Sequence, residues 1–132
     1  ATRPWQHVLE PISGYLLLAA SLRKKPSVFA GSWNFGPSSK EVRTVLEVAE
    51  HLIARFGSGS ISCASSENSH HEAGLLQLNC DRAHQMLEWY PRWDFERTLD
   101  MTVDWYRNVQ DGDEAKKVTR EQLYDYFPEI GK

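Results

Sequence analysis

The residues best suited to bind a ligand lie at the start of the chain, in the run Arg3-Pro4-Trp5-Gln6-His7. An arginine offers a permanently charged fork of donors that matches a diphosphate, and neighbouring rings can stack on a base. A frayed, solvent-exposed terminus would have the same composition. The run alone leaves both interpretations open.

A second polar cluster, His70-His71-Glu72, follows Asn68. Adjacent histidines project poorly toward one ion, and no HxxxH or HxxEH spacing supports them, so we expect no metal site. The same side chains can present hydrogen-bond donors to an anionic ligand, or they can belong to a solvated loop. Both interpretations stay open at this stage.

The chain lacks the glycine-rich motif that binds dinucleotides and the tyrosine–lysine pair that deprotonates a substrate hydroxyl. A pyrophosphate cradle needs closely spaced glycines at a strand-to-helix turn, yet none of the eight glycines is followed by another three residues later. None of the five tyrosines is followed four residues later by lysine, and there is no Walker A loop or GxSxG elbow. We therefore expect neither catalytic residues nor an NAD site in this chain.

Composition limits the partners that the chain can have. The 132 residues suit one compact domain, and a net charge of −3 gives no general attraction to nucleic acid. The longest apolar run, residues 15–20, is far shorter than the roughly 20 residues that span a bilayer. Two cysteines without CxxC spacing are typical of reduced thiols, so we expect a cytoplasmic protein with no membrane partner.

The elements that must position these residues are predicted from apolar spacing. Helices are expected over residues 10–24, 38–56, 80–87 and 94–110, where apolar side chains recur at helical intervals. Ser38 with Glu41 predicts the start of the second helix, and Thr119 with Gln122 that of a short terminal one. Gly57 and Asp94 are a natural helix end and a natural helix start.

Short strands are predicted over residues 4–9, 32–35, 60–64 and 75–78. Strands mixed with helices predict an α/β or α+β fold. So few strands make a thin sheet, which suggests that the chain is part of a larger structure.

Several stretches follow one another in an order and spacing typical of one enzyme family. They begin with Arg3 to Pro11 and continue through Trp33-Asn34-Phe35-Gly36-Pro37. They go on with His71-Glu72-Ala73, Pro91-Arg92-Trp93 and Thr102-Val103-Asp104-Trp105-Tyr106. In these stretches the sequence resembles CDP-glucose 4,6-dehydratases, a branch of the extended short-chain dehydrogenases.

This resemblance implies that the chain is the C-terminal portion of a longer, homo-oligomeric enzyme. Residues 1–37 would end a Rossmann-type NAD-binding sheet, and residues 38–132 would form the small domain that binds the CDP-sugar. The activity implied is NAD-dependent oxidation at C4 of the hexose, loss of water across C5 and C6, and return of the hydride to C6. The catalytic residues would lie in an N-terminal region outside this sequence, and the cut face should expose apolar surface.

The resemblance also implies four substrate-binding residues. Arg3 matches the arginine that contacts the diphosphate, whereas Asn68 and His71 occupy the loop near the phosphates and ribose. Ser39 falls where relatives that use thymidine nucleotides carry a ligand-contacting asparagine. We expect Arg3, Asn68 and His71 to converge on one side of the small domain.

The sequence departs from the family pattern at three positions. His70 stands where proline is expected, Asn79 where aspartate is expected, and Glu88 where glycine precedes Trp89. Two alternatives stay open. One is another extended short-chain dehydrogenase, such as an epimerase or a GDP-, dTDP- or UDP-sugar dehydratase. The other is a stand-alone, non-catalytic binding module.

Overall fold

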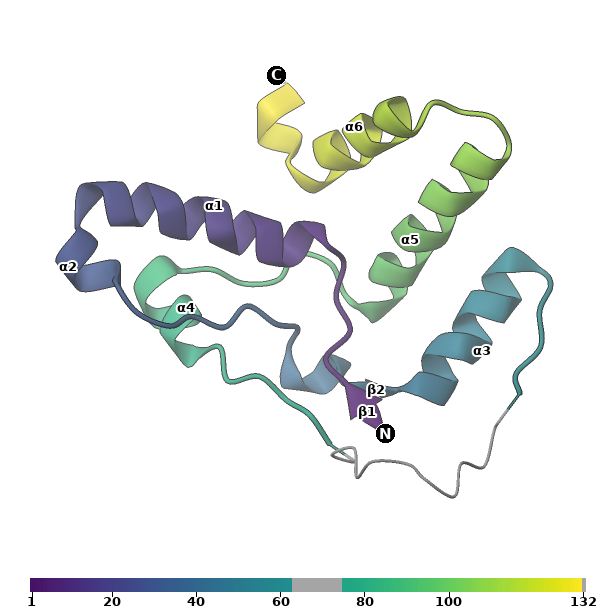
Figure 1. Cartoon of the computed structure of the whole chain (residues 1–132), viewed down its shortest axis with the longest axis horizontal. Helices are drawn as coiled ribbons and strands as arrows, with labels where there is room; N and C mark the ends of the chain where they lie inside the picture. The colour runs from purple at the N-terminus through teal and green to yellow at the C-terminus, as the bar shows by residue number, and fades with distance from the viewer. Residues whose placement is uncertain (63–74, 132) are drawn as a thin grey trace.

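The computed structural model describes residues 1–62 and 75–131, which form a mostly helical fold with a small antiparallel sheet (Figure 1). The strands are β1 (Thr2–Arg3) and β2 (Arg43–Thr44). The helices are α1 (Leu9–Lys24), α2 (Pro26–Phe29), α3 (Val45–Phe56), α4 (Asp81–Leu87), α5 (Phe95–Gln110) and α6 (Ala115–Tyr126), with 3₁₀ turns η1 (Ser39–Glu41) and η2 (Pro128–Gly131). The predicted helices over residues 10–24, 80–87 and 94–110 are confirmed to within one residue at each end.

The predicted strands over residues 4–9, 32–35 and 75–78 are wrong. β1 ends before Pro4, which has no N–H to continue a ladder, and the chain turns into α1 when Glu10 N donates to His7 O at 3.0 Å. A strand needs a partner backbone in register. Residues 32–35 meet side-chain amides instead, since Gln6 Nε2 donates to Phe35 O at 2.9 Å.

Residues 75–78 and residues 60–62 also form no strand. In residues 75–78 only Leu75 pairs with another backbone, through a parallel bridge to Thr2. Residues 60–62 are irregular, and residues 63–64 lie outside the described residues. The α/β prediction therefore holds only in its coarse form, as helices with a small sheet.

The second predicted helix starts later than expected. Ser38 caps only the turn η1, and Glu41 accepts a hydrogen bond from Phe95 N at 3.1 Å. The capping box of α3 is formed by Thr44 and Glu47, in which Thr44 Oγ1 accepts from Glu47 N at 3.1 Å and Glu47 accepts from Thr44 N at 2.7 Å. The intervening residues form β2, so the helix cannot begin before Val45. Its end at Gly57, with φ of 76°, is confirmed.

The predicted capping box at Thr119 and Gln122 is also wrong. α6 begins at Ala115, so both residues lie inside the helix and use their side chains to hold α5. Thr119 Oγ1 accepts from Trp105 Nε1 at 2.9 Å, and Gln122 Nε2 donates to Met101 O at 2.5 Å. By contrast, Asp94 caps α5 as predicted, because its carboxylate accepts from Arg97 N at 2.8 Å.

Two small hydrophobic clusters support the fold. The first joins α1, α2 and α4 through four buried residues, Phe35, Ala83, Leu87 and Trp89. The second joins α3 to α5 through Val48, Phe95 and Leu99, with Trp5 packed against it. Hydrogen bonds between the elements add to the packing of these two clusters.

The main polar contact is the carboxylate of Glu10, which is 0% exposed in the first turn of α1. It accepts from Arg92 N at 3.0 Å, from Trp93 N at 2.8 Å and from the Tyr126 hydroxyl at 2.6 Å. Ser13 Oγ extends the network, since it receives Trp89 Nε1 at 2.8 Å and lies 3.1 Å from the Tyr126 hydroxyl. Burial and the hydrogen bond to Glu10 raise the pKa of Tyr126, so the phenol stays protonated. This network ties α1, the turn before α5 and α6 together.

Glu10→Ala should lower the free energy of unfolding by about 3 kcal/mol or more, since each buried donor left without an acceptor costs about 1–3 kcal/mol. Urea unfolding followed by circular dichroism measures this. The control is Glu50→Ala, an exposed position on α3, which should change stability by no more than about 0.5 kcal/mol. Equal effects of the two variants would contradict the network's role.

The end of α4 is strained at Glu88. This residue has φ of 51° and ψ of 29°, a left-handed conformation in which a side chain crowds the backbone. Glycine adopts it freely, and glycine is what the family pattern places before Trp89. Glutamate at position 88 therefore lowers the stability of the folded backbone relative to glycine.

Glu88→Gly should raise the free energy of unfolding by about 0.5–1 kcal/mol, because relief of the left-handed strain exceeds the added freedom of the unfolded chain. Thermal and urea unfolding are the measurements. Glu88→Ala keeps a Cβ at the same backbone angles, so it should give no gain. A gain from alanine equal to that from glycine would point to the lost charge instead.

Candidate functional site

The small sheet brings together Arg3 and the strand that follows Ser39; Arg3 and Ser39 are two of the predicted ligand residues. β1 pairs with β2 in the register Thr2 to Thr44 and Arg3 to Arg43, and Thr2 also bridges Leu75. η1, which contains Ser39, immediately precedes β2, and the segment of Asn68 and His71 precedes Leu75. Backbone pairing thus places β1 beside both β2 and Leu75.

Arg3 lies directly opposite Arg43, and side chains of opposed residues project from the same face of a sheet. Arg3 Nη1 donates to Thr2 O at 2.8 Å. The Arg43 guanidinium donates to Lys40 O at 2.8 Å and lies 3.9 Å from the carboxylate of Glu41. Two guanidinium groups on one face of a sheet can together donate hydrogen bonds to an anion.

Sequence reasoning missed Arg43, because the prediction placed it inside a helix. No local pattern marks this residue, since its importance comes from pairing with a strand far away in the sequence. Trp5 reinforces the arrangement, because its Nε1 donates to Arg43 O at 3.2 Å.

Ser39 is exposed and lines an open hollow of about 710 Å³, formed by residues 37–39, residues 77–81, His84, Tyr90 and Pro91. The rings of His84 and Tyr90 stack 4.6 Å apart at its edge. Arg3 is not among the residues that line this hollow. Asn68 and His71 lie outside the described residues, and their convergence with Arg3 stays a prediction.

A second hollow, of about 500 Å³, lies where the segment before α1 meets α5 and α6. It is lined by Gln6, His7, Val8, Leu9, Thr102, Trp105, Tyr106, Thr119 and Gln122. None of these side chains is an aspartate, glutamate, lysine or arginine. The cavity is thus mainly apolar, with a few uncharged polar groups.

His7 is the titratable residue of this second hollow, and it is only 7% exposed. Its Nδ1 accepts from Leu9 N at 3.3 Å, and its ring packs edge-on against Trp93. Burial lowers the pKa of His7 from its usual 6.5. The neutral ring with Nδ1 as acceptor carries its proton on Nε2.

The lowered pKa makes folding sensitive to mild acid. The neutral ring's contribution is complete above pH 6.5, the unfolded pKa, and is lost as the pH falls through the lowered folded pKa. His7→Asn keeps an acceptor but cannot titrate, so its stability should fall less between about pH 7.5 and 5.5 than that of the wild type. Urea unfolding at both pH values tests this.

The control for that comparison is His84→Asn, which leaves His7 in place and should keep the wild-type dependence on pH. The carboxyls of Glu47 and Glu129, whose pKa values are lowered by hydrogen bonds from Thr44 and Arg92, act only at lower pH. An unchanged acid response in His7→Asn would contradict the assignment.

Other kinds of site find no support in residues 1–62 and 75–131. No group of histidine, cysteine, aspartate and glutamate side chains there is arranged to hold a metal ion. None of the helices in this part of the chain has the length and apolar character needed to cross a membrane. Cys80 is buried and its thiol is free, and burial raises its pKa.

No family model matches the chain. It is, however, 36% identical over 125 residues to the CDP-glucose 4,6-dehydratase of Salmonella typhimurium. The chain is similar to CDP-glucose 4,6-dehydratase. The resemblance predicted from the sequence motifs is therefore confirmed, and the alignment covers 95% of the chain rather than only the stretches that carry those motifs. The chain spans 35% of that relative's length.

Proposed function

We propose that this chain is the nucleotide-sugar-binding portion of an enzyme similar to CDP-glucose 4,6-dehydratase. The similarity along 95% of the chain is the observation that carries this proposal. The pairing of Arg3 with Arg43 supports it, because two guanidinium groups on one face of a sheet suit a diphosphate. The ligand class proposed is a CDP-sugar, and the reaction of the whole enzyme is C4 oxidation, loss of water across C5 and C6, and hydride return.

In this proposal the chain binds and orients the substrate and supplies no catalytic residue. Arg3, with Asn68 and His71, would hold the diphosphate and ribose, while Ser39 would contact the ligand from the hollow that it lines. Water is excluded from the diphosphate only if another part of the protein covers the sheet, since Arg3 is only partly buried in this chain.

The residues present do not fit NAD. A pyrophosphate cradle needs closely spaced glycines where a strand leads into a helix. Of the positive-φ glycines in the described part, Gly57 and Gly59 follow the end of α3, and Gly31 and Gly112 lie far from them in the sequence. The cofactor would therefore be bound by the N-terminal Rossmann region of a longer protein. No step of the reaction is assigned to residues of this chain.

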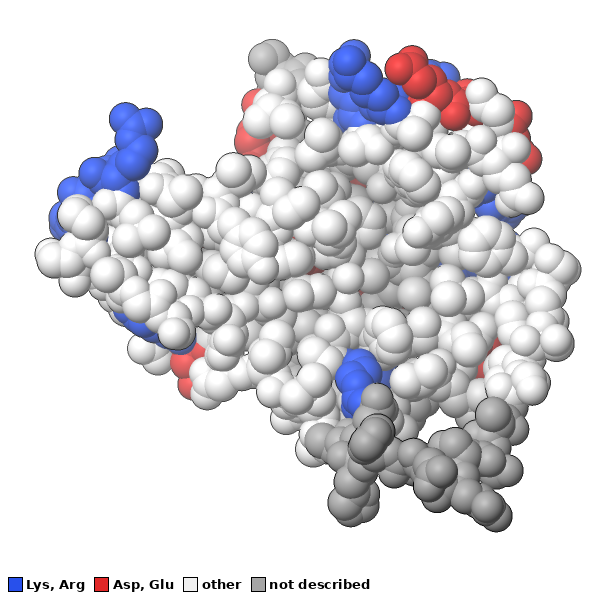
Figure 2. Space-filling view, in the orientation of Figure 1, with Lys and Arg blue, Asp and Glu red and all other residues white. Residues whose placement is uncertain are grey.

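The surface of α1 supports a missing partner region. Val8 is 62% exposed just before the helix, and Tyr15 and Leu16 are 60% and 61% exposed along it. Most of the charged side chains visible in Figure 2 lie toward the margins, and the surface over α1 is largely uncharged. We propose that residues 1–37 complete the cofactor domain and that residues 38–132 form the substrate domain. A homo-oligomeric enzyme and a cytoplasmic location stay predictions from the sequence.

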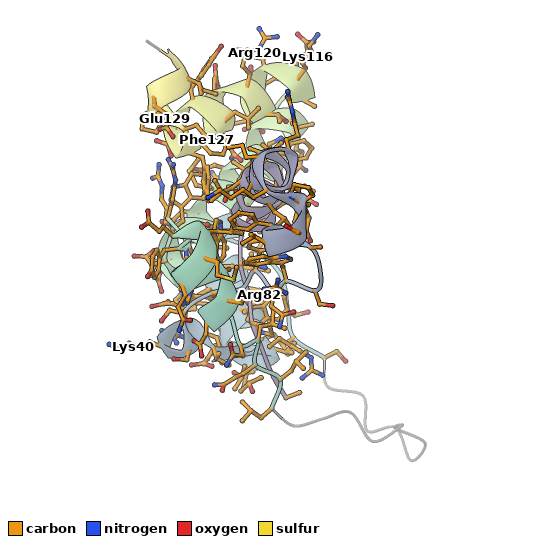
Figure 3. All side chains as sticks on the ribbon, turned by 90° about the vertical axis from the view of Figure 1, so that its left-hand side faces the viewer. Lys40, Arg82, Lys116, Arg120, Phe127 and Glu129 are labelled. Atoms are coloured by element: carbon orange, nitrogen blue, oxygen red, sulfur yellow. The ribbon has the colours of Figure 1, made fainter. Side chains whose placement is uncertain are left out.

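Arg3→Ala in the full-length protein should weaken CDP-glucose binding by about tenfold to a hundredfold, because it removes a charged hydrogen bond worth about 1.5–3 kcal/mol. Isothermal titration with CDP-glucose, CDP and NAD measures this, and NAD affinity should stay the same. The matched control is Arg120→Ala, an exposed position on α6 far from Lys40 of η1 (Figure 3).

Two results would contradict the proposed function. One is that Arg3→Ala binds CDP-glucose with the same affinity as the wild type and as Arg120→Ala. The other is NAD binding or CDP-glucose turnover by the 132-residue chain alone.

A further inference from the structure

The hollow between the segment before α1 and the pair α5–α6 has the properties of a ligand site that the proposed function does not use. Its volume of about 500 Å³ lies within the usual range for small-molecule sites. Its floor includes buried His7, Leu9 and Gln122, and its rim includes exposed Val8, Tyr106 and Thr119. It is therefore open to solvent at the top and closed by packed elements below.

The polar groups of the hollow are uncharged and their roles are partly fixed by the fold. His7 Nδ1 already accepts from Leu9 N, so the neutral ring offers Nε2–H as a donor. Thr119 Oγ1 accepts from Trp105 Nε1, which leaves its own hydroxyl proton to donate. Gln122 Nε2 donates to Met101 O, which leaves its Oε1 as an acceptor. The hollow thus presents both donors and an acceptor without any net charge.

The side wall is aromatic. The rings of Trp105 and Tyr106 meet edge to face with centroids 5.1 Å apart, and Tyr106 is 59% exposed. The negative face of an aromatic ring attracts weakly positive C–H groups. A phosphate or carboxylate would lose its water here and find no cation, whereas a purely apolar group would leave His7 and Gln122 unpaired.

We infer that this hollow binds an uncharged, hexose-sized saccharide. Hydroxyl groups match its mixture of donors and acceptors, and the C–H face of a sugar ring matches Trp105 and Tyr106. The saccharide can be free or can be the sugar part of a larger molecule, because only the ring and its hydroxyls are recognised. The inference goes beyond the proposed function, since it requires neither a nucleotide nor Arg3.

The experiment follows the five tryptophan indole N–H signals of the ¹⁵N-labelled chain during titration. The Trp105 signal is assigned by its loss in Trp105→Phe. The probes are methyl β-D-glucoside, CDP-glucose, CDP and glucose 6-phosphate. The variants are Tyr106→Ala and, as a control with the same 59% exposure, Tyr90→Ala, which lies outside this hollow.

The expected result is a saturable shift of the Trp105 signal with methyl β-D-glucoside, at a dissociation constant on the order of millimolar. Tyr106→Ala should weaken it by about twofold to tenfold, the range expected for one aromatic contact, while Tyr90→Ala leaves it unchanged. Glucose 6-phosphate should bind more weakly than the neutral glucoside. A shift with CDP-glucose but not with CDP identifies a sugar attached to a nucleotide as an additional source of the ligand.

Three results would overturn the inference. The first is the absence of a saturable Trp105 shift with methyl β-D-glucoside. The second is an unchanged affinity in Tyr106→Ala, and the third is a shift with CDP equal to that with CDP-glucose. Because methyl β-D-glucoside contains no nucleotide, failure of Arg3→Ala to affect CDP-glucose binding would leave this inference standing.

Discussion

The buried carboxylate of Glu10 holds together parts of the chain that are far apart in the sequence. It lies in the first turn of α1 and receives two backbone N–H groups from the turn before α5 and the hydroxyl of Tyr126 at the end of α6. Arg92 closes the same region from outside, because its guanidinium donates to Tyr126 O and pairs with Glu129. A buried carboxylate is tolerated when hydrogen bonds occupy its lone pairs, so these donors favour the observed packing of α1 against the turn before α5 and against α6. Glu10 and Tyr126 belong to neither of the two hydrophobic clusters, so the network is a separate contact between the elements.

The positions of both candidate ligand surfaces follow from this constraint. The segment that leads into α1 is fixed at its end by Glu10, and it carries Arg3 into the sheet and His7 into the hollow beside α5 and α6. Arg3 lies opposite Arg43 at the start of this segment, whereas the residues that line the hollow around His7 include no aspartate, glutamate, lysine or arginine. The two surfaces differ because strand pairing sets Arg3 opposite Arg43, while helix packing surrounds His7 with aromatic and amide side chains.

The similarity to a dehydratase extends along most of this chain but along only part of the relative. The chain matches 35% of the relative's length, and the exposed apolar residues of α1 show that this helix is incompletely covered within the described structure. The predicted strand over residues 32–35 did not form, because a strand requires a neighbouring strand in register. Side chains bond to the backbone of this segment instead, since Gln6 Nε2 donates to Phe35 O and Arg82 Nη1 donates to Ser32 O.

Local sequence determined α1, α4, α5 and the end of α3, because periodic apolar residues, Asp94 and Gly57 act within a few residues of themselves. Motif order alone also determined the resemblance to CDP-glucose 4,6-dehydratases. The tertiary structure decided what depends on distant partners. Two Ser/Thr-x-x-Glu patterns occur near the start of α3, one at Ser38 and one at Thr44. The second caps α3, because Arg43 and Thr44 pair with β1 and the helix can begin only after them. Thr119 and Gln122 have the spacing of a capping box, but their side chains form hydrogen bonds with α5 instead. The pairing of Arg3 with Arg43 and the burial of Glu10 likewise arise only from packing, since no local pattern specifies which distant backbone will meet a given side chain.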